Sequence, residues 1–149
     1  PGSHFASLKQ GAAYAVEGRD TVTFAPEIAR LTLNLAMTHF DAGGSAYGER
    51  LIFGGHTIAM AAATAVRAFP EMATIVAWRS CDHLAPVFEG DILQTRLDVT
   101  GVRPLEEGGL ADIRAVVTAE YGAAGQKALK VAPGTTKDVL DWRFVALFA

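Results

Sequence analysis

Several features that mark large classes of protein are scarce or missing in this sequence. It contains a single cysteine, Cys81, which excludes an intrachain disulfide framework and fits a reducing compartment. The formal net charge is −3, which argues against broad binding to nucleic acid or to a membrane surface. The first residues are small or polar, so we expect no secretory leader. These absences together favour a cytoplasmic protein.

Motifs for metal, phosphate and nucleophile chemistry are missing as well. There is no pair of cysteines, no His-x-x-x-His and no glycine-rich loop of the kind that cradles phosphates. Ser45 follows two glycines, but it lacks the Gly-x-Ser-x-Gly setting of a nucleophile elbow. We therefore expect no metal site, and any chemistry has to come from ordinary side chains and backbone groups.

The most apolar segment of the chain runs over residues 54–69 and is followed by Pro70. Arg67 is the only residue in it that is charged at neutral pH, and apolar side chains occupy nearly every face of the helix that its spacing predicts. Such a helix is buried, and it is too short to span a bilayer. The 149 residues, half of them hydrophobic, predict a single domain over 1–149 built on this helix.

Most of the remaining chain alternates between apolar and polar residues. This period of two predicts strands over 21–24, 74–81, 91–102, 109–121 and 139–148. Short glycine-containing connections at 106–109 and 122–125 favour antiparallel pairing. A second helix is predicted from Pro26 to Met37. The predicted class is α+β, with an antiparallel sheet wrapped around the buried central helix.

Asn34 and His39 are the first candidates for chemistry. They are five residues apart and cannot share a face of one continuous helix, but the glycine-rich loop that follows predicts that the helix ends between them. His39 would then be free to act as a base near neutral pH, and Asp41 could orient its ring. Alternatively, His39 caps the C-terminus of a helix, and Asp41 is a solvated loop carboxylate.

Gly54 and Gly55 open the buried helix, where backbone N–H groups are unpaired and the helix dipole is positive. An oxygen that gains negative charge during a reaction would be stabilised there, although the glycines could also serve only close packing. His56 and His83 are further candidates. Their alternatives are a hydrogen-bonded core histidine and a structural histidine at a strand end.

Taken together, these segments resemble the MaoC-like dehydratases of the hotdog fold, the enoyl-CoA hydratase 2 type. The opening stretch over 5–23 and the segment over 82–91, with its Ala-Pro-Val and Gly-Asp, resemble the corresponding parts of the family. A more specific string, Arg-Leu-Ile-Phe-Gly-Gly-His over 50–56, resembles the carboxy-terminal half of mesaconyl-CoA (2-methylfumaryl-CoA) hydratases, which are double-hotdog proteins. The chain is half that length, so it is either a stand-alone relative that dimerises or one half of such a protein.

The family's catalytic motif is Gly-Asp-x-Asn-Pro-x-His-x-Asp, followed by a glycine near the start of the hotdog helix. His39 and Asp41 match the end of this motif, and Gly55 matches the glycine. Asn34 stands where the family has its catalytic aspartate. An amide cannot take a proton, so the resemblance implies His39 as the only base and Asn34 as a residue that positions water.

The resemblance implies reversible hydration of a 2-enoyl-CoA, with the thioester oxygen bound by backbone N–H groups of Gly54 and Gly55. Asp41, His56 and His83 are second-tier site residues, and Arg50 or Arg79 could meet a substrate carboxylate or a CoA phosphate. No cofactor is expected, because CoA is part of the substrate. The expected partner is a second hotdog, in a homodimer or in a longer protein. A non-catalytic half-domain that binds acyl-CoA or a partner, and a hotdog thioesterase, are the alternatives.

Overall fold

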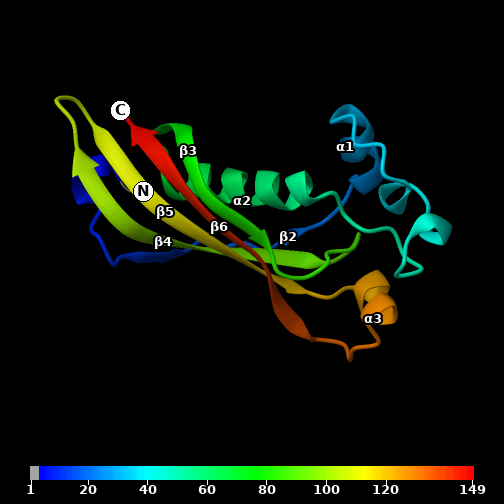
Figure 1. Cartoon of the computed structure of the whole chain (residues 1–149). Coiled ribbons are helices and arrows are strands. Elements are labelled where there is room, and N and C mark those ends of the chain that lie inside the picture. Colours follow the sequence, from blue (N-terminus) through cyan, green and yellow to red (C-terminus); the bar gives the residue numbers. More distant parts are fainter. Residues whose placement is uncertain (1–3) are drawn as a thin grey trace.

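The computed structural model describes residues 4–149, which form an antiparallel sheet curved around one side of a central helix, α2 (Gly54–Ala68; Figure 1). The strands, in chain order, are β1 (Ala13–Ala15), β2 (Asp20–Thr21), β3 (Met72–His83), β4 (Ile92–Pro104), β5 (Gly109–Glu120) and β6 (Thr136–Phe148). The long strands lie in the order β4-β5-β6-β3, and β1 and β2 both pair with β4. The predicted α+β class is therefore confirmed.

Shorter helical segments lie at the ends of this unit. They are η1 (Phe5–Ser7), α1 (Ala25–Leu31), η2 (Met37–His39), η3 (Ala42–Gly44) and α3 (Ala123–Leu129). Figure 1 shows α1 beyond the N-terminal end of α2, and α3 between β5 and β6. No helix within residues 4–149 is both long and apolar enough to cross a membrane.

Strand β5 illustrates how the alternating sequence builds the core. Ile113, Ala115 and Val117 are at most 1% exposed and belong to the cluster of side chains between the sheet and α2. The residues between them, such as Arg114 and Thr118, carry polar groups on the opposite, outer face. Because successive side chains of a strand point to opposite faces, the period of two alone places one set inside.

The helix predicted over 26–37 ends early, at Leu31. Leu33 adopts a left-handed conformation with φ of 56°, through which a right-handed helix cannot continue. The side-chain Oδ1 of Asn34 then accepts a hydrogen bond from the backbone N–H of Ala36 at 3.1 Å. A short polar side chain that bonds nearby backbone competes with the helix, which explains the early end.

One predicted strand and one predicted turn also need correction. The strand predicted over 21–24 is only β2, because Phe24 has a left-handed φ of 57° and directly precedes α1. The connection predicted as a short turn over 122–125 is instead α3, followed by a loop that leads into β6. Its sequence contains Lys127 and Leu129 among good helix formers, and Leu129 packs against the core. The predicted antiparallel pairing of β5 and β6 is nevertheless confirmed.

The composition of α2 predicted a helix that is buried all round. In the structure, α2 is buried on one side only. His56, Thr57, Ala61, Thr64 and Ala65 are buried, whereas Val66 is 51% exposed and Ala59 and Ala63 are also exposed. The sheet is a single layer and covers only one face of the helix. Alanine-rich composition therefore identified the central helix but did not show which of its faces the chain itself covers.

Candidate active site

His39 lies at the end of η2 and is only 8% exposed. Its Nδ1 is 2.7 Å from the backbone carbonyl oxygen of Leu51, and the N–H of Leu51 donates to the carbonyl of Thr38 at 2.9 Å. A carbonyl oxygen can only accept, so Nδ1 of His39 carries the hydrogen and donates it. The lone pair of the neutral ring is therefore on Nε2, which has no hydrogen-bond partner within residues 4–149.

A cavity of about 440 Å³ adjoins this imidazole. Its lining includes His39, Gly54 and Thr57 from the start of α2, and His83 from the end of β3. The remaining wall is largely apolar and includes the loop after β3 as far as Val87. The fold thus brings together segments that are more than forty residues apart in the sequence.

Gly54 is the first residue of α2 and follows Phe53, which gives no side-chain cap. The backbone N–H groups of Gly54 and Gly55 have no hydrogen-bond partner among the described residues, as expected for the first turn of a helix. Gly54 lines the cavity, whereas Gly55 lies under the ring of Phe53. The positive end of the helix dipole therefore points toward a space that a ligand oxygen could occupy.

Gly54 is also required for packing, because a side chain there would collide with His83. A Cβ at this position would lie 2.7 Å from Nε2 of His83, closer than real Cβ atoms come. The functional and the packing interpretations of this glycine are thus compatible. The ring of His83 lies directly against the head of α2.

The other predicted site residues lie outside this cavity. Asn34 uses Oδ1 to hold the N–H of Ala36, and Asp41 uses Oδ1 to accept from the N–H of Gly43 at 2.9 Å. The ring of His39 is held by a backbone carbonyl and not by Asp41. Asp41 instead borders a second, polar cavity, together with Arg50.

His56 is buried within the core side of α2, at 6% exposure, and its Nδ1 has no partner in the described chain. Loss of solvent lowers the pKa of His56, and the negative charges of Asp20 and Glu89 oppose this only in part. A neutral, buried imidazole at this position is a core residue, although not the fully hydrogen-bonded one that the sequence suggested.

The two arginines considered for anion binding are both engaged. Arg50 donates to Glu89 at 2.6 Å, and Arg79 donates to Asp112 at 3.2 Å. A substrate carboxylate or phosphate would have to compete with these carboxylates. No group of three His, Cys, Asp or Glu side chains within residues 4–149 is arranged to hold a metal ion.

Sequence reasoning missed several contributors to the cavity, among them the side chains of Tyr47 and Thr57 and one backbone carbonyl. Thr57 lies three residues after Gly54 on the same face of α2, so helical spacing could have identified it. The carbonyl oxygen of Leu51 fixes the ring of His39, but backbone acceptors leave no mark in a sequence.

Comparisons with known proteins bear on the fold and the family resemblance. No family model matches the chain. Mesaconyl-CoA hydratase from Cereibacter sphaeroides is 30% identical over 121 residues, which make up 78% of this chain and 35% of that protein. RV0216 from Mycobacterium tuberculosis, described as a double hotdog fold, is 44% identical with a TM-score of 0.82, over 99% of this chain and 41% of RV0216.

A protein from Chloroflexus aurantiacus that is named as a MaoC domain dehydratase is 20% identical, with a TM-score of 0.81 over 98% of this chain and 44% of that protein. At that identity, the likeness shows the fold alone. The chain spans less than half the length of each of these three relatives. The chain has the hotdog fold, and the predicted resemblance to the MaoC-like dehydratases is confirmed.

Proposed function

We propose that this domain catalyses the reversible hydration of a 2-enoyl-CoA thioester, with mesaconyl-CoA as the first candidate substrate. The observation that carries the proposal is the environment of His39. Its Nδ1 is fixed by the carbonyl of Leu51, so its basic Nε2 is left free beside a cavity that ends at the head of α2. A positioned base beside unpaired backbone N–H groups is the arrangement that addition of water to a thioester-activated double bond requires.

In the proposed reaction, Nε2 of His39 takes a proton from water as the water oxygen bonds to C3 of the enoyl group. The electrons of the double bond move toward the thioester oxygen, and backbone N–H groups of Gly54 and Gly55 stabilise the resulting enolate. The proton held by His39 is then delivered to C2, which completes the addition of one water. General acid–base catalysis of this kind contributes roughly 10²–10⁴-fold.

Asn34 is proposed to position the water. Its Oδ1 is already occupied by the N–H of Ala36, so the amide NH₂ is the group left to hold a water oxygen. Asp41 and His56 are assigned only supporting roles, because the carbonyl of Leu51 and not Asp41 holds the ring of His39, and His56 is buried in the core. The proposed reaction uses no cofactor and no metal, since the CoA thioester itself activates the double bond.

We also propose that residues 1–149 form one hotdog domain and that a second hotdog completes the site, either as another copy or as the other half of a longer protein. Leu31, Leu33 and Leu35 are 80–83% exposed, and Trp78 on the edge strand β3 is 55% exposed. Apolar side chains that are this exposed, next to a strand edge without a neighbouring strand, are typical of an interface. The double hotdog fold of RV0216 supports the same arrangement.

The test is a spectrophotometric assay of mesaconyl-CoA and crotonyl-CoA side by side, with free thiol measured in parallel and the oligomeric state determined by light scattering. We expect the enoyl absorbance to fall without release of thiol, and the His39→Ala variant to be inactive. Release of thiol would identify a thioesterase instead. Binding of acyl-CoA with neither reaction would favour the non-catalytic half-domain, which the replacement of the family's aspartate by Asn34 makes the second candidate.

A further inference from the structure

His83 is placed at the same end of α2 as the proposed thioester site. It is the last residue of β3 and pairs across the sheet with Leu140, whose side chain is fully buried on the inner face. The tip of its ring faces Gly54, since a Cβ there would lie 2.7 Å from Nε2 and 2.8 Å from Cε1. The nitrogen at this tip therefore lies against the residue that opens the helix.

The ring of His83 has no hydrogen bond or ion pair to any residue in 4–149, although it lines the cavity. The same cavity is bordered by the imidazole of His39, which is more than nine-tenths buried and leaves Nε2 without a partner. His83 is exposed, so water reaches its ring when the cavity is empty. Both imidazoles therefore keep a nitrogen available to a ligand that enters the cavity between them.

We propose that His83 is a catalytic residue that donates a hydrogen bond from Nε2 to the thioester oxygen, together with the backbone N–H of Gly54. This inference rests on the function proposed above. The two histidines then act at opposite ends of the reacting group: His39 moves the proton of water, and His83 stabilises the charge that develops on oxygen. No proton is transferred by His83, so its N–H bond stays intact throughout.

The alternative is that His83 only fills the space above Gly54. Two substitutions separate the two roles. His83→Phe keeps an aromatic ring against the glycine but removes the donor, whereas His83→Gln keeps an N–H donor without the ring. Removal of one donor from an oxyanion site typically lowers kcat by about 10²–10³-fold.

The experiment compares wild type, His83→Phe and His83→Gln on the same enoyl-CoA, with folding checked by circular dichroism. The carbonyl stretching frequency of a bound, ¹³C-labelled thioester is recorded by infrared difference spectroscopy. We expect His83→Phe to lose about 10²–10³-fold in kcat with little change in KM, and its carbonyl band to move to higher frequency. His83→Gln should recover part of both effects.

Wild-type kcat and an unshifted carbonyl band in a folded His83→Phe would overturn the role of His83 and leave the hydratase proposal standing. Equal losses in His83→Phe and His83→Gln, with the band unmoved, would also overturn it, because they would indicate packing. If the wild-type protein hydrates no enoyl-CoA, the proposed function fails first, and the role of His83 fails with it.

Discussion

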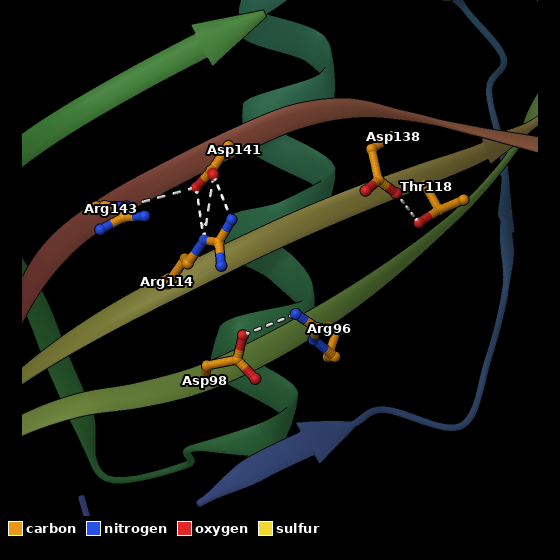
Figure 2. Close-up of polar contacts among 7 residues, drawn as sticks. All are labelled: Arg96, Asp98, Arg114, Thr118, Asp138, Asp141 and Arg143. Atoms are coloured by element: carbon orange, nitrogen blue, oxygen red, sulfur yellow. Dashed lines mark hydrogen bonds and ion pairs between the residues drawn. The ribbon is translucent and has the colours of Figure 1, made fainter. Parts of the chain in front are cut away.

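Polar groups on the outer face of the sheet have hydrogen-bond partners within residues 4–149, whereas several polar groups at the head of α2 do not. On the outer face, polar side chains have found partners within the sheet (Figure 2): Arg114 donates to both carboxylate oxygens of Asp141 at 2.6–3.1 Å, and Thr118 donates to Asp138 at 2.7 Å. At the head of α2, the imidazole Nε2 of His39 and the first helical N–H groups have none among the described residues.

This difference indicates which region has polar groups available for a ligand. The bond from Arg114 lowers the pKa of Asp141 and keeps it charged, so the pair is already satisfied before any ligand arrives. The groups around the cavity have no partner among the described residues, so they are available to a ligand that enters it. The charged side chains of the outer face are thus paired with each other, whereas the candidate site is built from histidines and backbone N–H groups.

The largest effect is expected at the head of α2, where Nε2 of His39 has no partner among the described residues. His39→Gln should lower kcat for enoyl-CoA hydration by roughly 10²–10⁴-fold, because glutamine can form hydrogen bonds but cannot accept the proton of water. Its unfolding midpoint should stay within a few degrees of wild type. The measurement is steady-state kinetics with circular dichroism as the control, and a variant that keeps wild-type kcat would remove His39 from the mechanism.

A buried carboxyl that has partners sharpens the comparison. Asp91 is fully buried and accepts from the N–H groups of Phe88 and Gly122, each at 2.8 Å, yet burial raises its pKa to about 6. The folded state then holds a proton more tightly than the unfolded state, whose carboxyl titrates near 3.8. Stability from this group is therefore complete well below pH 4 and lost as the pH rises through about 6.

Relative to Asp91→Asn, the wild-type protein should lose about 2 kcal/mol of unfolding free energy between pH 4 and pH 7, because each pKa unit is worth about 1.36 kcal/mol and part of the loss occurs below pH 4. Urea unfolding of both proteins across this range measures the difference, and the amide variant serves as its own baseline because it does not titrate. Parallel pH profiles for the two proteins would show that Asp91 keeps an ordinary pKa.

Gly54→Ala should have an intermediate effect at the head of α2. The added methyl group must displace the ring of His83, with which it would collide at 2.7 Å. Displacement of a positioned group by about 1 Å costs on the order of 10²-fold in rate, so we expect a kcat reduction of roughly 10–10²-fold. In a double-mutant cycle with His83→Phe the two losses should be less than additive, and full additivity would mean that they act separately.

The smallest effect is expected on the outer face. Arg114→Ala should cost about 1 kcal/mol of unfolding free energy or less, because its side chain is 34% exposed and solvent screens the pair with Asp141. Hydratase activity should be unchanged. Chemical denaturation of Arg114→Ala, Asp141→Ala and the double variant measures the coupling between the two side chains. A large loss of activity in Arg114→Ala would contradict the contrast between the two regions.

The elements themselves were largely predictable from the sequence. The alternation of β5, with Ile113 and Val117 on one side and Arg114 on the other, defines a half-buried strand, and the apolar run that opens at Gly54 defines a helix. Where prediction failed, as after Leu31, local side-chain bonds and a left-handed residue won over helical spacing. Such competition depends on contacts of a few residues that spacing alone does not weigh.

By itself, the sequence determined the strands, the central helix, the candidate histidines and the family resemblance, because periodicity and motifs are local properties of the chain. Only the tertiary structure decided that His39 is fixed by the carbonyl of Leu51, that His83 lies against Gly54, and that Asn34 and Asp41 are committed to their own loops. These are contacts between segments, or between side chains and backbone, and they exist only once the sheet has curved around α2.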